Sequence, residues 1–230
     1  MRFAVFSDMH GNQYALSSVL EEIEKESIDQ ILILGDFVGY YYGVLEILKM
    51  LEKYQYHAIK GNHEDLLANA IKVGSFESLN EKYGKSHLMS FKSLSSEQLK
   101  FLITLPETIK LTIDGLRILM CHGSPWDNDF YVYPNADYSV LKRFEEYPFE
   151  FIFFGHTHYA TELKTKHGVV VNPGSIGQSR EIGGQAYWGI LDTELKSYTQ
   201  RITPYDVRAL ENEVLEHDPE RSYNFKILRR

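Results

Sequence analysis

The stretch Arg2-Phe3-Ala4-Val5-Phe6-Ser7-Asp8-Met9-His10-Gly11-Asn12 begins as a short apolar run and ends in a carboxylate and an imidazole. Residues 2–6 are too few for a helix and are bounded by turn-forming residues, so they predict a buried strand. Asp8 and His10 follow the carboxyl end of that strand, where open α/β sheets bind their ligands. The stretch therefore predicts an α/β fold and the place of its functional site.

Strands and helices alternate through the first 60 residues. Apolar residues in 13–25 recur at spacings of three and four, which predicts an amphipathic helix. Strands are predicted at 30–34 and 56–59, with a helix at 44–51 between them. This βαβαβ order implies a mainly parallel sheet with right-handed crossovers. All three strands then deliver their polar ends to one edge of the sheet.

The pattern changes after residue 63. Residues 64–105 carry helical patterns without intervening strands, and we expect a helical insert there, its last helix opening with a capping box at Ser95 and Gln98. Asp114-Gly115 between two apolar runs predicts a β-hairpin over 109–120. The remaining predicted elements are strands at 149–154, 169–171, 187–191 and 198–202, and helices at 137–145 and near 206–216. The basic residues of the tail, Lys226, Arg229 and Arg230, are expected to face solvent.

The composition favours a single domain over residues 1–230. Hydrophobic residues make up 43% of the chain, and no linker-like stretch marks a boundary. A formal net charge of −8 argues against a general nucleic-acid binder, so a nucleic-acid partner is unsupported. The single cysteine, Cys121, suits a reducing compartment. With no signal peptide and no apolar run of membrane-spanning length, we expect a cytoplasmic monomer or small homo-oligomer without a membrane partner.

Side chains with oxygen or nitrogen donor atoms recur at the predicted strand ends. They are carboxylates, a carboxamide and imidazoles, in chain order Asp8, His10, Asp36, Asn62, His63, His122, His156 and His158. Such a mixed oxygen and nitrogen set suits Mn, Fe, Co, Ni or Zn. Because one ion takes about four to six such ligands, the number suggests two divalent ions, with Asp36 as the bridge.

Two divalent ions about 3.5–4 Å apart can share a hydroxide and clamp the charge of an in-line displacement at phosphorus. A single Asp, Asn or His at a strand end is more often a turn or structural residue. Five strand ends of the same kind on one α/β pattern favour a common site. Histidines outside this pattern are assigned no role in it: His57, His87, His167 and His217.

Five short motifs resemble, in the same order, the sequence blocks of the calcineurin-like metallophosphoesterases. They are Asp8-Met9-His10, Gly35-Asp36, Gly61-Asn62-His63-Glu64, His122-Gly123 and Gly155-His156-Thr157-His158. Residues 35–40, 121–125 and 172–175 are similar to the small bacterial and archaeal phosphodiesterase branch. The resemblance implies a four-layer α/β fold, with two stacked mixed β-sheets flanked by helices.

The resemblance also implies roles for the strand-end residues. One metal would be held by Asp8, His10, Asp36 and His158, and the second by Asp36, Asn62, His122 and His156. His63 would donate a proton to the leaving group or stabilise a phosphate oxygen, so His63 and Asp36 are the expected catalytic residues. The expected ion is Mn, with Fe, Ni, Co or Zn as alternatives. The expected activity is hydrolysis of a small, nucleotide-like phosphodiester, with phosphomonoesters and dinucleoside polyphosphates as alternative substrates.

Several readings stay open. The tyrosines at 40–42 could stack a base or pack beneath the helical insert, and the loop that begins at Trp126 could be a substrate wall or an ordinary loop. Arg180 could hold a substrate phosphate or lie at the surface. A cysteine phosphatase is excluded because Asp127 stands where its phosphate loop needs arginine. A non-catalytic scaffold on the same fold would lack ligands, and none is missing here.

Overall fold

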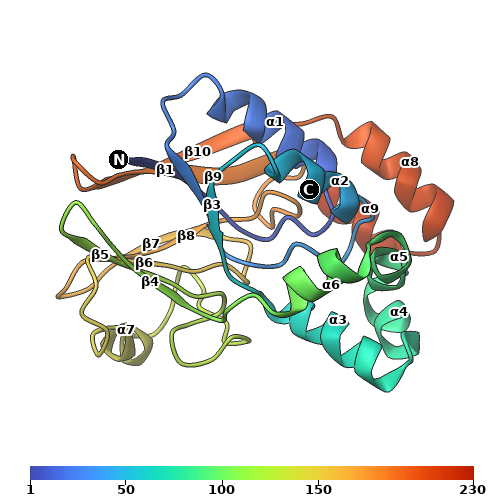
Figure 1. Ribbon diagram of the computed structural model, residues 1–230, viewed down its shortest axis with the longest axis horizontal. Coiled ribbons are helices and arrows are strands. Elements are labelled where there is room, and N and C mark those ends of the chain that lie inside the picture. The colour runs from blue at the N-terminus through green and yellow to red at the C-terminus, as the bar shows by residue number, and fades with distance from the viewer.

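Two mixed sheets of five strands are stacked in the computed structural model, which describes residues 1–230 (Figure 1). The first sheet consists of β1 (Arg2–Phe6), β2 (Gln30–Ile33), β3 (Tyr56–Ala58), β9 (Gln185–Asp192) and β10 (Ser197–Pro204), in the order β10-β9-β1-β2-β3. The second consists of β4 (Ile109–Ile113), β5 (Leu116–Met120), β6 (Phe151–Phe153), β7 (Ala160–Lys164) and β8 (Val169–Pro173), in the order β4-β5-β6-β8-β7. The predicted four-layer fold of two stacked mixed sheets is confirmed.

Nine helices surround the sheets. They are α1 (Gln13–Ile23), α2 (Val44–Leu51), α3 (Asn62–Val73), α4 (Glu77–Tyr83), α5 (Ser86–Ser93), α6 (Ser96–Ile103), α7 (Tyr138–Phe144), α8 (Val207–His217) and α9 (Ser222–Leu228). None of them combines the length and the apolar composition that crossing a lipid bilayer requires. The predicted capping box is present at the start of α6, where Ser95 and Gln98 bond each other's backbone N–H groups.

Strands β1, β2 and β3 are parallel, and so are β5, β6 and β8, so each sheet gathers three carboxyl ends at one edge. Antiparallel strands complete both sheets: β9 pairs with β1, and β4 pairs with β5 in the predicted hairpin. Since β9 and β10 come from the last quarter of the chain and complete the sheet that β1 begins, we infer that the chain forms one domain.

Alternate residues of β1 face two different cores. Phe3 and Val5 point into the layer between the sheets, where they join Ile118 and Phe153 of the second sheet. Ala4 and Phe6 face the opposite core, which the first sheet shares with α1 and α2. This alternation is the two-residue period of a strand, and it fixes the order helices, sheet, sheet.

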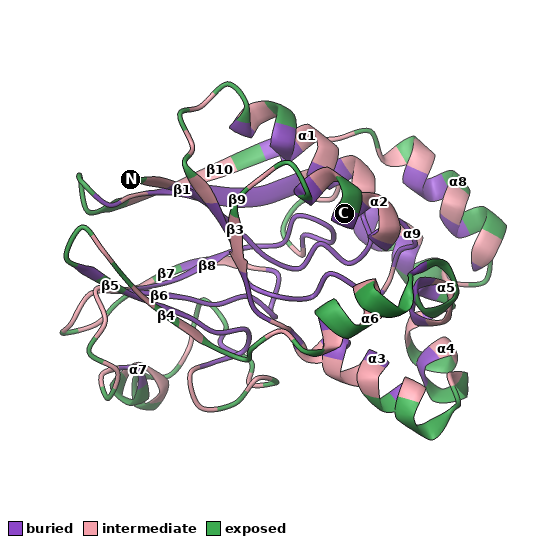
Figure 2. Ribbon diagram, in the orientation of Figure 1, coloured by how far each residue is buried: buried purple, intermediate pink, exposed green.

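The outer face of the second sheet provides the fourth layer. Leu119 and Ile152 pack there against Phe144 of α7. Helices α3–α6 lie instead at the end of the sheets where the strands leave for their loops (Figure 1). The loops between these strand ends and the surrounding helices are buried (Figure 2).

Two elements are absent from the sequence prediction. Strand β7 forms the edge of the second sheet, and α9 buries Ile227 and Leu228 against α8. The basic residues of the tail are nevertheless exposed, as predicted. A short amphipathic segment such as α9 has too little periodicity to be identified before its packing partner is known.

Candidate metal centre

The five strand exits identified in the sequence meet at the common edge of the two sheets. Three exits belong to the first sheet, after β1, β2 and β3, and two to the second, after β5 and β6. Asp36, after β2, lies at the middle of the cluster, since its Oδ2 is 3.3 Å from His122 Nε2 and 3.6 Å from His10 Nε2. The structure thus places residues more than 80 positions apart in van der Waals contact.

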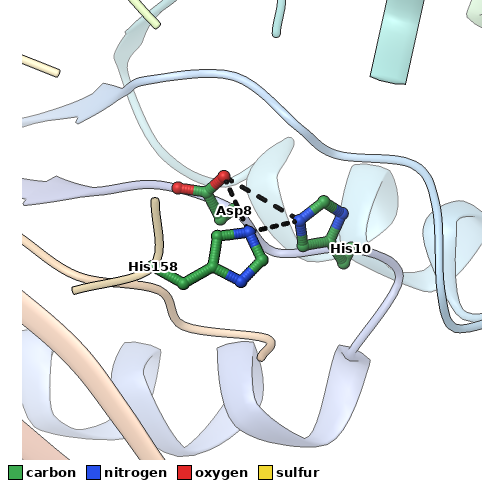
Figure 3. Close-up of side chains that lie close together, drawn as sticks. All are labelled: Asp8, His10 and His158. Carbon is green, nitrogen blue, oxygen red and sulfur yellow. Dashed lines mark hydrogen bonds and ion pairs between the residues drawn. The ribbon is translucent and has the colours of Figure 1, made fainter. Parts of the chain in front are cut away.

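The first group of donor atoms contains Asp8, His10 and His158 (Figure 3). Asp8 Oδ1 lies 3.3 Å from His158 Nε2 and 3.8 Å from His10 Nε2. The two Nε2 atoms are 3.0 Å apart. All three side chains are buried, so water does not screen the group.

The second group contains Asp36, His122 and His156. Asn62 joins it, because its Oδ1 lies 3.2 Å from His122 Nε2 and 3.1 Å from His156 Nδ1. His63 belongs to a third group with His10 and Asp36. All eight residues singled out in the sequence therefore lie in or beside one cluster, and Asp36 belongs to two of its three groups.

Three histidine rings are held in one orientation. Nδ1 of His10 lies 2.9 Å from the carbonyl oxygen of Val38, and His122 and His158 make the same contact with other backbone carbonyls, at 2.7 and 2.8 Å. A carbonyl only accepts, so each Nδ1 carries a proton, and in the neutral ring each Nε2 presents a lone pair. This is the arrangement usual for histidine ligands of metals.

Two of these lone pairs face each other. His10 Nε2 and His158 Nε2 are both acceptors at 3.0 Å, and two acceptors cannot bond without a positive group shared between them. Adjacent nitrogen ligands of one ion lie about 3 Å apart when each is about 2.1 Å from it. The donor set therefore fits a divalent metal.

The charge of the cluster leads to the same conclusion. Asp8 and Asp36 are 0% and 1% exposed, and their ion-pair contacts are with histidines alone. Burial opposes ionisation of Asp36, but the nearby imidazoles, led by His122, hold its pKa well below its usual value. Burial also opposes protonation of His122, but Asp36 outweighs it and raises the pKa of His122 to about 10. Two buried carboxylates thus require positive charge, which a metal can supply.

The backbone of the ligand loops is strained. The φ angle is positive at Asp8 (56°), His10 (48°), Asp36 (54°), His156 (68°) and His158 (62°). Non-glycine residues rarely adopt this left-handed conformation, and such strain gathers at functional sites.

Two glycines let the loops approach each other. A Cβ on Gly61 would collide with Asp36 Oδ1, and one on Gly155 would lie 2.7 Å from Asp8 Oδ2. Each glycine is next in sequence to a donor of the cluster, Asn62 or His156, so its lack of a side chain lets loops of different strands converge.

Glu64 stands in one of the five sequence motifs but was assigned no role there. Its buried carboxylate accepts the backbone N–H groups of Asp36 (2.9 Å), Phe37 (2.9 Å), Val38 (3.1 Å) and Gly61 (2.7 Å). Burial and the charge of Asp36 raise the pKa of Glu64 to about 7, and the N–H donors oppose that shift. Glu64 therefore ties the loop after β2 to the start of α3. A glutamate three residues after the cap of a helix is the signal that could have identified it.

His87 was assigned no role from the sequence, but the structure places it beside the cluster. Its ring stacks on His63 at 5.2 Å, and its Nε2 lies 3.2 Å from His63 Nδ1. Because His87 contacts Nδ1, the Nε2 of His63 is the nitrogen that remains to face the cluster. His87 lies on α5, so no strand-end pattern could identify it.

Of the aromatic residues whose roles the sequence left open, some lie beside the cluster and others pack in the core. Tyr40 packs edge-on against His10 at 4.7 Å, whereas Tyr41 and Tyr42 are buried in a core with α8 and α9. Trp126 packs against Phe144 and is not part of the cluster. Tyr131, further along the same loop, lies instead 4.1 Å from His156.

Comparison with known proteins agrees with this fold and identifies the family of the chain. A family model described as the calcineurin-like phosphoesterase superfamily domain matches residues 1–196. The chain belongs to this superfamily, and its class is that of the metallophosphoesterases, hydrolases that use divalent metals. The chain is also 30% identical over 208 residues to an uncharacterized protein of Methanocaldococcus jannaschii, a match that covers 82% of each chain.

Solved structures share the architecture. A hypothetical protein of Pyrococcus horikoshii superposes with a TM-score of 0.83 at 24% identity, covering 100% of this chain and 98% of its own. A metallophosphoesterase of Sphaerobacter thermophilus gives 0.77 at 22% identity and covers 94% of both chains. An archaeal phosphodiesterase gives 0.56 at 21% identity and covers 88% of this chain and 99% of its own. At these identities the likeness establishes the fold.

Proposed function

We propose that this protein is a metal-dependent phosphodiesterase that hydrolyses a small phosphate ester at a pair of divalent ions. One observation carries the proposal. The Oδ2 atom of Asp36 faces His10 on one side, at 3.6 Å, and His122 on the other, at 3.3 Å, so a single carboxylate lies between two groups of metal donors.

The donor groups on the two sides of Asp36 would each hold one ion. Asp8, His10 and His158 would complete the first site, and Asn62, His122 and His156 the second. When bound, such a pair activates a water molecule as the nucleophile and offsets negative charge at the phosphorus. Among Mn, Fe, Co, Ni and Zn, which suit this donor set, we propose Mn.

The chain's own groups would position the ester and the proton that it needs. The backbone N–H of His63 donates to Asp36 Oδ1 at 2.9 Å, which anchors the start of α3 at the centre. His87 restrains the His63 ring through Nδ1, so Nε2 would face the bound phosphate. His63 would then protonate the leaving oxygen or stabilise a phosphate oxygen.

Chelation followed by addition of single metals tests the proposal. Rates would be measured with para-nitrophenyl phosphate, bis-para-nitrophenyl phosphate and thymidine 5′-para-nitrophenyl phosphate, after removal of metal and addition of Mn, Ni, Zn or Mg. We expect chelation to abolish hydrolysis and Mn to restore it, with both diesters cleaved faster than the monoester. Hydrolysis that survives chelation would contradict a metal mechanism, and a preference for the monoester would contradict the diesterase.

The H63Q variant separates the role of His63 from that of a metal ligand. Loss of a general acid lowers kcat by about 10²- to 10⁴-fold. We expect a loss of this size on bis-para-nitrophenyl phosphate, with two metal ions per chain retained by elemental analysis. Loss of an ion together with the rate would show instead that His63 is a ligand.

A further inference from the structure

A cavity of about 320 Å³ adjoins the metal centre. We call it the tyrosine pocket and define it by six of its lining residues: Tyr40, Tyr83, Tyr131, Tyr223, Lys82 and Arg180. Pockets for small ligands occupy about 300–1,000 Å³, so its volume suits one ring system with a small substituent.

Two of the tyrosines form a wall that the pocket shares with the metal centre. The Tyr40 ring lies 4.7 Å from that of His10 and 5.2 Å from that of His63. On the other side, the ring of Tyr131 lies 4.1 Å from that of His156. The pocket therefore adjoins both donor groups, and an ester held by the metals would extend into it.

The aromatic rings come from segments far apart in the sequence. Tyr83 lies at the end of α4 and packs edge-on against Tyr40 at 5.5 Å. Tyr223, on α9, is tilted toward Tyr40 at 6.3 Å and is 44% exposed. Rings that are incompletely packed against one another leave faces free for a planar group. Such faces stack on any nucleic-acid base, whichever base it is.

Arg180 provides positive charge without an acidic partner. No carboxylate lies within ion-pair distance of its guanidinium, and its Nε is buried without a hydrogen-bond partner. Four tyrosine side chains line the same pocket: Tyr40, Tyr83, Tyr131 and Tyr223. By contrast, Arg221, in the same pocket, donates to backbone carbonyls at the end of α4, including that of Lys82 at 3.2 Å. A partly buried guanidinium without a partner is the group that a phosphate or carboxylate satisfies.

The charge of the pocket differs from that of the whole chain. The chain carries a formal net charge of −8, but Lys82, Arg180 and Arg221 line the cavity and no acidic residue does. This local reversal of sign favours an anionic ligand over a neutral one.

We propose that the tyrosine pocket binds the part of the substrate beside the reacting phosphorus, a planar aromatic ring linked to a second anionic group, and that Arg180 binds that anion. This inference rests on the proposed phosphodiesterase activity and narrows its substrate to the class of mononucleotide-sized diesters that carry an additional phosphate or carboxylate.

Two substrates that differ in one phosphate test the role of Arg180. Thymidine 5′-para-nitrophenyl phosphate and its 3′-phosphorylated form share the reacting diester and the leaving group. A charge-assisted hydrogen-bond pair contributes about tenfold to hundredfold in binding. We expect wild-type kcat/KM to favour the 3′-phosphorylated ester by about tenfold or more, R180M to bring this ratio close to one, and R180K to keep part of it.

A matched arginine variant and a binding measurement complete the test. The R117M variant removes an arginine from the surface of β5 and should keep the wild-type ratio. Calorimetric titration of chelated protein with thymidine 3′,5′-bisphosphate should show binding that R180M weakens about tenfold and that inorganic phosphate reproduces only in part. Should R180M fail to fold, R180K and Y223A, measured in the same way, decide the question.

The outcomes separate the two proposals. If wild-type protein hydrolyses neither thymidine ester nor bis-para-nitrophenyl phosphate with any metal, the phosphodiesterase proposal fails. If it hydrolyses them but the ratio and the bisphosphate affinity are the same in R180M, the pocket proposal is overturned and the phosphodiesterase proposal stands.

Discussion

The metal centre and the tyrosine pocket share a wall but are built in opposite ways. Every donor of the metal centre follows a strand within a few residues, and all except the half-buried Asn62 are buried. The pocket instead combines the loop after β2 with α4, α9 and the loop that carries Arg180, and Tyr131 and Tyr223 are 46% and 44% exposed. The sheets thus position the donor atoms, whereas the helices and loops around them shape the space that an ester would enter.

Replacing the central carboxylate of the metal centre should have the largest effect. D36N keeps the shape of the side chain but removes the charge that lies between the donor groups. We expect kcat/KM on bis-para-nitrophenyl phosphate to fall by about a thousandfold, as for loss of a central electrostatic group, and metal content to fall below two ions per chain. If D36N kept both ions and the wild-type rate, Asp36 would not be the central ligand of the metal centre.

Glu64 tests whether the metal centre depends on its supporting backbone. In E64Q an NH₂ group replaces one of two oxygens that accept buried N–H groups, which leaves donors facing each other. We expect a loss of about 3 kcal/mol in the free energy of unfolding, measured with urea, and a tenfold to hundredfold loss of metal affinity. E97Q, an exposed glutamate in the first turn of α6, is the matched control and should change neither.

The pocket should respond to substitution without loss of metal. Y223A removes one stacking face, and we expect about a fivefold or larger increase in KM for thymidine 5′-para-nitrophenyl phosphate, with metal content unchanged. Y138A removes a tyrosine that is 69% exposed on α7 and should leave KM as it is. If Y223A lost metal instead, the two regions would not be separable.

The smallest effect should come from a surface ion pair outside both regions. Arg117 and Glu150 bond at the end of β5 opposite to His122, and Arg117 lowers the pKa of Glu150 to about 2. A depressed carboxyl pKa adds stability above its usual pKa that disappears as pH falls toward 2. R117M should therefore lower the free energy of unfolding in urea only slightly at pH 7, because water and salt screen exposed pairs, and by less still at pH 2, where part of Glu150 is protonated. An equal cost at both pH values would assign the effect to packing.

The sequence predicts the metal centre better than its surroundings for a physical reason. A short apolar run that ends in Asp or His encodes both a strand and its exit, because the two-residue period and the turn that follows are local properties. Parallel strands then bring those exits to one edge whatever the details of packing. The positions of Asp8, Asp36 and His122 follow from this alone.

Contacts between distant segments could not be predicted in this way. Glu64 satisfies backbone groups 26 to 28 positions away, and His87 reaches His63 from a helix whose place is set by packing. Strand β7 and helix α9 likewise pack against segments that their own sequence does not identify, β8 and α8.

The α/β alternation and the chemical kind of each strand-end side chain are encoded locally, because both depend on neighbours in the chain. Packing between distant segments instead sets which way Tyr40 and Tyr41 face, the first toward the cluster and the second into the core, and leaves Arg180 with no acid beside it. Which side of a loop faces a cavity depends on every element packed around it, and that arrangement is settled by burial across the whole domain.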